Sequence, residues 1–406
     1  MSIRVAMVSP YPAPDSKRGG MAWYTKNLLD NLPSDVEVIV IADKSKVLPS
    51  SYADGRSKVF RSWSYGLRFF WGVLKQIRDL RPDLVHFQHE IFLYGSAVPA
   101  VLFPLLVLMV RLMGIPVVVT LHNGILPLSN VQGQFLKENG IQGPPRLMKY
   151  GLRGLLGAIA LLSNAAIVHE GLLRSILIDE YGCAPEKVAV VHHGVEAPRI
   201  PVPMDLAKQQ LGLADEKMVL FLGYIAGYKN LELLIDAATL SKTEGWTLII
   251  GGGKHPRLAS DLGYQAYVRS LMDRAAGAPP GRIRFVGFIP DDRLELYVSA
   301  ADLIVFPYKN CMSASGPLTI AMSYGRPILL SNAFKGVVDL EDMMFGSTAE
   351  ELAHRIDSAL AEGGRLGRNV DELVGSRQWK VVSDRTAMVY ERVIAGLPVV
   401  QPASGP

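Results

Sequence analysis

Residues suited to binding a phosphate group follow four apolar runs in this chain. They are Gly19-Gly20, His122, Lys229 and the loop around Ser315. A glycine lets a ligand approach the backbone, a helix N-terminus offers unpaired amides to an anion, and a lysine ammonium is a compact charge that suits phosphate. Each also has an ordinary structural alternative: a loop glycine, a core histidine bonded to a backbone carbonyl, a solvated lysine, or a serine that caps its own helix.

The stretch from residue 302 to 327 shows the clearest pattern. A run of valine, isoleucine and phenylalanine predicts a buried strand, small residues at 313–317 predict a loop, and the apolar segment after them predicts a helix. In an open α/β sheet such a turn lies at the carboxyl end of a strand, where ligands bind. We therefore expect an anion site here, with hydroxyl donors from Ser313, Ser315 and Thr319.

A second group of polar residues raises the question of a metal site. His86, His89 and Glu90 end another predicted strand. Successive residues of a strand point to opposite faces, so His86 and Gln88 share one face and His89 lies on the other. The two histidines cannot bind one ion without a bend in the strand, and the histidine pair at 192–193 separates in the same way. We therefore expect no metal.

Buried runs and helical stretches alternate along the whole chain. This alternation predicts an α/β fold with parallel, doubly wound sheets. A chain of 406 residues is too long for one hydrophobic core, and a proline-rich connection interrupts the pattern after about residue 195. We expect two Rossmann-like domains, 1–196 and 197–378, that face a central cleft. A C-terminal helix at 379–396 is expected to pack back on the first domain.

The composition is that of a globular protein, with 49% hydrophobic and 20% charged residues. Cys183 and Cys311 form neither a disulfide framework nor a zinc pattern, and we expect two buried free thiols in a reducing compartment. The absence of a signal-peptide pattern favours a cytoplasmic protein. The first 200 residues have 21 Lys and Arg against 15 Asp and Glu. No nucleic-acid-binding motif accompanies this charge.

Two segments of the first half combine apolar side chains with basic ones. Between Arg56 and Arg81, basic residues alternate with aromatic ones, including Trp63 and Trp71. This composition fits an anionic membrane surface, although a helix with one core face and one solvated basic face is the preferred interpretation. The stretch 97–113 is too short to span a membrane. We expect a buried or interfacial helix there, and peripheral contact with the inner face of a membrane remains an open hypothesis.

In order and spacing, these stretches resemble the retaining glycosyltransferases of the two-domain GT-B architecture, the group often called family 4. The matching segments are GGMAWYTKNLLDNL, TLHNG, VAVVHHGV, LGYIAGYKNLELLIDA, IIGGG, RFVGFIPDDRLELYVSAADLIVFPY and SGPLTIAMSYGRPIL. Together they cover nearly the whole chain. The resemblance implies that the C-terminal domain binds a nucleotide-diphosphate sugar and that the N-terminal domain binds the acceptor.

The resemblance also implies a role for each matching residue. His122 is expected to contact the donor sugar near the reacting carbon and Lys229 to bind the phosphates, so these two are the candidate catalytic residues. The other candidate donor-binding residues are Gly19, Gly20, Gly223, Tyr224, Phe288, Ile289, Ser313, Ser315, Gly316, Pro317, Leu318 and Thr319, and the candidate acceptor-binding residues are His89, Glu90 and Asn123.

Three departures from the family pattern concern the donor. Tyr224 stands where the family usually has an arginine, and Met312 and Ile320 stand where it has two glutamates spaced E-x7-E. These glutamates normally contact the sugar hydroxyls and the ribose. Some relatives have a comparable small-residue loop, so the departures leave activity open while removing the usual signal for donor identity.

The expected function is hexosyl transfer with retention, without metal or cofactor, in glycan, glycolipid or exopolysaccharide biosynthesis. The acceptor is expected to be a sugar, a lipid-linked sugar or a small molecule. The alternatives are a natural-product glycosyltransferase and a non-catalytic protein that binds sugar nucleotides. An epimerase or phosphorylase would need acidic residues or a pyridoxal-phosphate lysine, and neither is placed convincingly.

Overall fold

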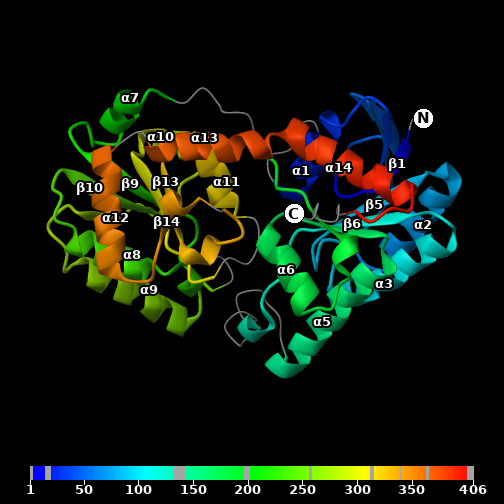
Figure 1. The fold of residues 1–406 in the computed structure, drawn as a ribbon, viewed down its shortest axis with the longest axis horizontal. Helices are drawn as coiled ribbons and strands as arrows, with labels where there is room; N and C mark the ends of the chain where they lie inside the picture. Colours follow the sequence, from blue (N-terminus) through cyan, green and yellow to red (C-terminus); the bar gives the residue numbers. More distant parts are fainter. Residues whose placement is uncertain are drawn as a thin grey trace, which may run out of the picture. The chain divides into compact units, whose positions relative to one another are not determined.

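The computed structural model describes residues 3–13, 20–131, 143–195, 202–255, 258–310, 315–338, 340–362 and 365–399. Contacts divide the chain into two units (Figure 1): unit 1 consists of residues 1–194 and 377–406, and unit 2 of residues 195–376. Each unit contains one sheet with helices on its faces, built almost entirely from parallel strands. The predicted α/β fold with two Rossmann-like units is confirmed.

The sheet of unit 1 has eight strands in the order β3-β4-β2-β1-β5-β6-β7-β8. Every neighbouring pair is parallel except β3 and β4, which form an antiparallel edge. The strands are β1 (Ile3–Val8), β2 (Val36–Asp43), β3 (Ser51–Asp54), β4 (Ser57–Trp63), β5 (Leu84–His89), β6 (Val117–Leu121), β7 (Ala165–Val168) and β8 (Val188–Val190).

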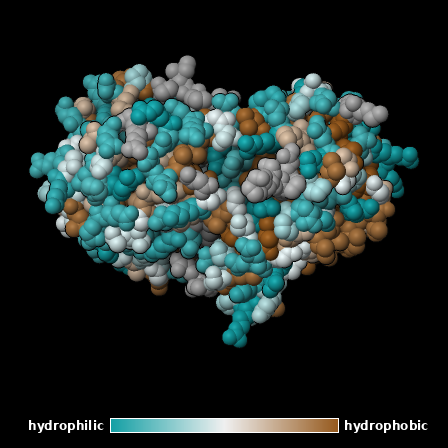
Figure 2. Space-filling view, viewed as in Figure 1, coloured by the Kyte–Doolittle hydropathy of each residue, from teal (hydrophilic) through white to brown (hydrophobic). Residues whose placement is uncertain are grey.

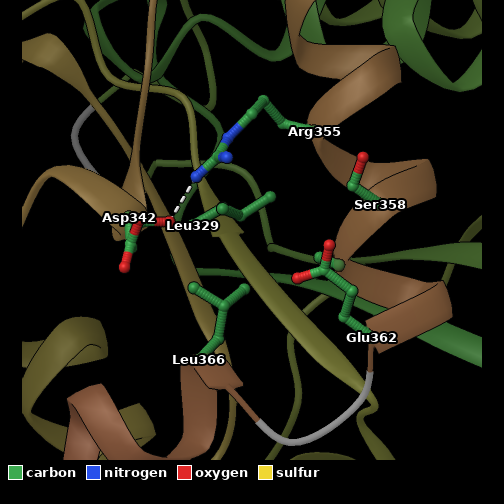
Figure 3. A pocket seen from close by; sticks show the side chains of 7 residues that line it. Leu329, Asp342, Arg355, Ser358, Glu362 and Leu366 are labelled. Atoms are coloured by element: carbon green, nitrogen blue, oxygen red, sulfur yellow. Dashed lines mark hydrogen bonds between the residues drawn. The ribbon is translucent and has the colours of Figure 1, made fainter.

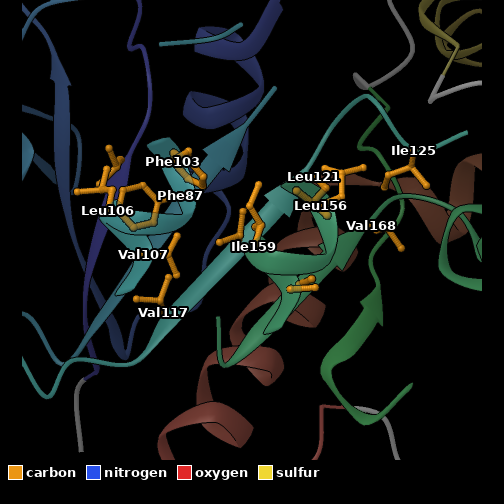
Figure 4. Packing of buried hydrophobic residues seen from close by; sticks show 14 of the residues in the cluster. Phe87, Phe103, Leu106, Val107, Val117, Leu121, Ile125, Leu156, Ile159 and Val168 are labelled. Carbon is orange, nitrogen blue, oxygen red and sulfur yellow. The ribbon is translucent and has the colours of Figure 1, made fainter. Parts of the chain in front are cut away.

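Helices cover both faces of this sheet because its strands are apolar on both sides. One face packs against α2 (Arg68–Leu80), α3 (Ala97–Leu112), α5 (Pro145–Leu162) and α6 (Gly171–Asp179), and Figure 4 shows part of that core. The opposite face packs against α1 (Gly20–Asp30) and α14 (Trp379–Ile394), which lie side by side. The chain therefore returns to its first unit at its C-terminal end.

Strand β5 shows the alternation that the sequence predicted. His86 lies on the face covered by α14, where its Nδ1 is 2.7 Å from the hydroxyl of Tyr390. His89 lies on the other face, with its ring 4.5 Å from the ring of Phe103 in α3. The prediction that the two histidines point in opposite directions is confirmed.

The basic aromatic segment at 56–81 is not one helix, so the preferred interpretation of it was wrong. Its first part is β4, which pairs with β2 and β3, and only its second part is helix α2. Strand β4 has alternating burial, with Val59, Arg61 and Trp63 inside. Of its two basic residues, Lys58 is exposed, whereas Arg61 is buried and pairs with Asp43. Over a short window this alternation of burial resembles that of an amphipathic helix.

Unit 2 contains a six-stranded sheet in the order β11-β10-β9-β12-β13-β14, with every neighbouring pair parallel. Its strands are β9 (Lys217–Leu222), β10 (Trp246–Gly251), β11 (Ile283–Phe285), β12 (Leu303–Phe306), β13 (Ile328–Ser331) and β14 (Met344–Phe345). Its helices are α7 (Met204–Gln210), α8 (Leu231–Leu240), α9 (Leu262–Ala275), α10 (Asp291–Ala300), α11 (Gly316–Ser323), α12 (Ala349–Glu362) and α13 (Arg365–Arg377).

A buried ion pair fastens the C-terminal return to unit 1. Arg377 donates two hydrogen bonds to the carboxylate of Glu170, at 2.8 and 2.9 Å, and both side chains are almost fully buried. Burial by itself would raise the pKa of Glu170, but the bonds from His192 and Arg377 outweigh it and lower that pKa. Glu170 is therefore a carboxylate near neutral pH, and it depends on Arg377 for its compensating charge.

We expect Arg377→Met to lower the free energy of unfolding of the protein by about 3–5 kcal/mol, because it leaves the Glu170 carboxylate buried without a cation. The double variant Glu170→Gln/Arg377→Met should recover part of this loss. Urea denaturation measures both. The control is Arg274→Met, which breaks the exposed pair with Asp236 and should cost only about 0–1 kcal/mol. Equal losses for Arg377→Met and the control would contradict the assignment.

Candidate functional site

In both units the strand order reverses beside the first strand. In unit 1 the chain moves from β1 to β2 on one side and later to β5 on the other, and in unit 2 it moves from β9 to β10 and later to β12. Ligands of open α/β sheets bind outside the carboxyl ends of the strands at such a reversal. These two places are therefore where the predicted site residues should gather, and they are described here one unit at a time.

At the carboxyl ends of β5, β6 and β7, a chain of hydrogen bonds joins three side chains. The Nε2 atom of His122 lies 2.6 Å from Oε1 of Gln88, and its Nδ1 atom lies 2.9 Å from Nε2 of His169. The Nδ1 atom of His169 then lies 2.9 Å from the carbonyl oxygen of Val191. Both ring nitrogens of His122 are thus engaged inside unit 1.

The protons of this chain can be counted. The carbonyl of Val191 only accepts, so Nδ1 of His169 donates to it, and Nε2 of a neutral His169 must accept from Nδ1 of His122. Nε2 of a neutral His122 then has no proton and needs a donor. The Gln88 amide satisfies it when the amide group is turned, so that its nitrogen takes the place of the oxygen now 2.6 Å from His122. A ligand can use a nitrogen of His122 only by replacing Gln88 or His169.

Aromatic rings surround the two histidines. The ring of Tyr24 in α1 lies 4.6 Å from that of His122 and 5.0 Å from that of His193, and the indole of Trp379 in α14 lies 5.2 Å from Tyr24. A Cβ atom at Gly194 would overlap the indole of Trp379, so only glycine fits there. We call Tyr24, His122, His169, His193 and Trp379 the histidine–aromatic cluster.

Burial keeps five imidazoles of unit 1 neutral. It lowers the pKa of His86, His89 and His169 to about 3, and it lowers the pKa of His122 and His193 as well. Nearby histidines add to the effect at His122. Because the rings stay neutral, each offers one donor and one acceptor nitrogen near pH 7.

The other predicted residues of unit 1 have different surroundings. His89 is 1% exposed, so it lies within the core beneath α3. Asn123 accepts a hydrogen bond from the amide of Ile91 at 3.0 Å, and burial raises the pKa of Glu90. Gly20 begins helix α1 with a positive φ of 67° and is exposed, while Gly19 lies outside the described residues.

In unit 2, Lys229 lies at the strand reversal with its ammonium nearly buried. The residue is 6% exposed, and its Nζ lies 5.5 Å from the ring centre of Tyr308 and 5.8 Å from that of Phe221. Among the described residues, no carboxylate forms an ion pair with it. Burial lowers its pKa to about 8. A buried cation without a counter-charge is costly, and an anionic ligand would supply that charge.

Gly223 and Pro317 border Lys229 directly. A Cβ atom at Gly223 would overlap Nζ of Lys229 and would lie 3.3 Å from Cγ of Pro317. Gly223 also has a φ of 118°, a backbone conformation that residues other than glycine rarely adopt. The end of β9, the lysine and the start of α11 are therefore brought together.

Some backbone amides at the N-terminus of helix α11 are already bonded to its N-cap residue, Ser315. Ser315 Oγ accepts from the amide of Leu318 at 3.3 Å, and the amide and hydroxyl of Thr319 both donate to the Ser315 carbonyl. Pro317 has no amide hydrogen. The N-cap that the sequence left as an alternative is thus present, and Gly316 offers the first amide to a ligand. Ser313 lies outside the described residues.

Two exposed aromatic rings lie near these residues. Tyr224 and Phe288 are stacked, with ring centres 6.1 Å apart and planes at 14°, and they are 40% and 59% exposed. Ile289 is buried and packs toward Gly251. Tyr224 stands where the resemblance to the family implies an arginine, and in the structure this edge of unit 2 is aromatic.

Sequence reasoning missed four members of the site in unit 1. Tyr24, His169, His193 and Trp379 were not proposed as site residues. His169 directly follows the buried strand β7, as His122 follows β6, so the rule applied to His122 would have found it. His193 was considered only as a metal ligand, and Tyr24 and Trp379 give no comparable local signal.

Beyond these residues, the described parts of the chain contain a pocket but no candidate metal site. No three His, Cys, Asp or Glu side chains in the described ranges are grouped so that they could hold a metal ion. A pocket in unit 2 lies between α12 and β13, and Figure 3 shows Arg355, Glu362 and Asp342 lining it. None of the predicted site residues lines this pocket. Cys183 is a buried free thiol as expected, whereas Cys311 is outside the described part.

The neutral histidines predict a stability that depends on pH. Unfolded histidine has a pKa near 6.5 and the folded rings titrate near 3, so between these values the unfolded chain binds more protons. Stability should therefore fall as pH drops below 6.5, by about 1.4 kcal/mol per pH unit for each such histidine. Urea denaturation between pH 7.5 and 5 measures this slope. His86→Gln should make it shallower, and an unchanged slope would contradict the prediction.

Comparison with known proteins finds a family match within each unit. The profile of Glycosyltransferase Family 4 matches residues 18–199, and that of Glycosyl transferases group 1 matches residues 216–362. Sucrose-phosphate synthase from Thermosynechococcus elongatus superposes with a TM-score of 0.68 at 19% identity, covering 97% of this chain and 100% of that one. HepE from Anabaena, solved with UDP and glucose, superposes with a TM-score of 0.64 at 16% sequence identity, covering 96% of this chain and 99% of that one.

Relatives found by sequence match a smaller share of the chain. A D-inositol 3-phosphate glycosyltransferase from Mycobacteroides abscessus is 26% identical over 70% of this chain and 62% of its own length. An uncharacterized glycosyltransferase from Methanocaldococcus jannaschii is 23% identical over 54% of this chain and 57% of its own. The chain thus spans about three fifths of the length of these curated relatives. With both profiles matched in order and a GT-B fold in the structural neighbours, the chain belongs to the family 4, group 1 glycosyltransferases.

Proposed function

We propose that this protein is a retaining glycosyltransferase that moves a hexosyl unit from a nucleotide-diphosphate sugar to an acceptor hydroxyl. The observation that carries the proposal is the buried ammonium of Lys229, which lies at the strand reversal of unit 2 without a carboxylate partner among the described residues. A diphosphate is the anion that such a group suits. The relative HepE, solved with UDP-glucose, makes UDP the first nucleotide to test.

The proposed mechanism is electrostatic. Negative charge grows on the departing diphosphate as the glycosidic bond breaks, and Lys229 together with the Gly316 amide stabilises it. The low-dielectric surroundings of Lys229, formed by Phe221 and Tyr308, strengthen that attraction. In this mechanism no metal is required, because the lysine supplies the charge that a metal would otherwise contribute. Retention follows if the acceptor attacks the face that the diphosphate leaves, with the diphosphate taking the acceptor proton.

The proposed acceptor side is unit 1. There the histidine–aromatic cluster offers a ring surface, Asn123 and Glu90 follow strands β6 and β5, and the exposed Gly20 begins helix α1. Because both nitrogens of His122 are engaged, we propose that it first contacts a sugar through its ring edge and that a polar contact requires exchange with Gln88. The acceptor is a sugar, a lipid-linked sugar or a small molecule of glycan, glycolipid or exopolysaccharide biosynthesis.

Lys229→Met should abolish most nucleotide binding and lower the rate of transfer about 100- to 1,000-fold, which is the effect of losing one charge-stabilising donor. The measurements are a thermal shift with UDP, GDP, ADP, CMP and TDP and their sugars, followed by release of the nucleotide. Saturation at a hundredfold excess over Kd adds about 2.7 kcal/mol of stability. Lys242→Met is the matched control, since that exposed lysine lies at the opposite end of α8.

Two results would change the proposal. Binding of one sugar nucleotide without turnover would favour the non-catalytic alternative, which the replacement of the usual arginine and glutamates by Tyr224, Met312 and Ile320 makes worth testing. Equal nucleotide binding by Lys229→Met and the control would refute the assigned site. The anomeric configuration of the first product, read by NMR, decides between retention and inversion.

The same lysine predicts how nucleotide binding depends on pH. Its pKa of about 8 means that the ammonium is charged at pH 7 and loses its proton as pH rises. The affinity for a nucleoside diphosphate should therefore decrease above pH 8, by up to about tenfold per pH unit. Titration calorimetry between pH 7 and 9.5 measures the decrease. Lys229→Met should bind weakly with no such decrease, and a flat wild-type profile would contradict the prediction.

A further inference from the structure

Helix α3 of unit 1 is apolar on two opposite sides. Its inner side, with Phe103, Leu106 and Val110, belongs to the core. Its outer side forms a second stripe at helical spacing, consisting of Val98, Val101, Leu102, Leu105 and Leu112, which are 53%, 67%, 36%, 49% and 78% exposed. An ordinary surface helix has a polar outer side. The outer stripe of α3 is therefore an apolar surface that meets solvent.

The neighbouring helices extend this surface. Helices α2 and α5 both pack against α3. Helix α2 and the residue before it add Leu67 and Trp71, which are 57% and 75% exposed, and α5 adds Leu147, Tyr150 and Leu161, all more than 60% exposed. Figure 2 shows apolar side chains gathered on the side of unit 1 where α2 and α3 lie. We call these exposed side chains of α2, α3 and α5 the outer face.

The charged residues on these three helices are basic with one exception. Their sequences contain seven basic residues and one acidic residue, Asp79; the basic residues are Arg68, Lys75, Arg78, Arg111, Arg146, Lys149 and Arg153. An apolar stripe with cations around it and exposed tryptophan and tyrosine is complementary to a layer of anionic headgroups over acyl chains. A second copy of this chain would instead bring two basic faces together, and like charges oppose such a contact.

From this charge and shape we infer that the outer face docks unit 1 on an anionic lipid surface, with the apolar stripe of α3 at the level of the headgroups. The contact is peripheral, since no helix among the described residues is long and apolar enough to cross a bilayer. The inference rests on the proposed function in one respect. Docking of the outer face would hold the proposed acceptor unit at a membrane, where a lipid-linked acceptor is found. A freely diffusing acceptor would not require the outer face.

Vesicle flotation tests the docking without donor or acceptor, so its result is independent of the nucleotide experiments. The full chain should float with phosphatidylcholine vesicles that contain 30% phosphatidylglycerol and should stay at the bottom with phosphatidylcholine alone. Raising the salt concentration should release it. Absence of flotation with the anionic vesicles would overturn the inference, whether or not the protein binds a sugar nucleotide.

Variants assign the contact to the outer face. Val101→Ser/Leu105→Ser/Leu112→Ser should lower the vesicle-bound fraction at least tenfold, and Arg68→Gln/Lys75→Gln should lower it about fivefold for each charge removed. The matched controls are Leu262→Ser, since Leu262 is also 78% exposed, and Arg269→Gln; both residues lie on α9 of unit 2. Circular dichroism and a cooperative thermal unfolding transition confirm that each variant is folded.

Two outcomes would overturn the assignment. If the outer-face variants float as well as the controls, another surface binds the lipid. If sedimentation shows a dimer that the α3 variant abolishes, and vesicles do not compete with it, then the outer face binds a second copy and the lipid inference is wrong.

Discussion

The reversal of strand order beside the first strand of each sheet is the constraint on which the site depends. Parallel strands need a crossover, usually a helix, between neighbours, and a sheet with apolar side chains on both faces needs helices on both. When the chain turns from one side of β1 or β9 to the other, the loops that follow the central strands separate and leave room for a ligand. Gln88 and His122 in unit 1, and Gly223 and Lys229 in unit 2, are positioned by this geometry.

Two buried charged groups, one in each unit, differ in how they are compensated. In unit 1 the Glu170 carboxylate pairs with Arg377 and accepts a further hydrogen bond from His192, and the pair with Arg377 joins residues far apart in the sequence. In unit 2 the Lys229 ammonium has rings of Phe221 and Tyr308 nearby and no carboxylate partner in the described part of the chain. A matched pair contributes to the structure, whereas an unmatched cation is suited to a ligand that brings its own negative charge.

The five neutral histidines of unit 1 are a further case in which burial decides the charge of a side chain. Burial disfavours a cationic imidazole there, and the Val191 carbonyl, which only accepts, fixes which nitrogen of His169 donates. His122 is then a ring held in one orientation by partners on either side. This differs from the outer face, where the apolar side chains of α3 are exposed among the described residues and where we propose a lipid contact.

The sequence by itself determined the buried strands, the helix α11 that follows β12, and the placement of His86 and His89 on opposite faces, because each of these depends on periodicity within a few residues. It did not separate strand β4 from helix α2, since alternating aromatic and basic residues fit both periods in a short window. Only the tertiary structure decided that Tyr24 meets Trp379, that Glu170 pairs with Arg377, and that Lys229 is buried beside Gly223 and Pro317. The first two contacts join residues more than two hundred positions apart in the sequence, and the third joins the ends of separate strands and helices. All three depend on how whole helices pack onto a sheet, which no local pattern specifies.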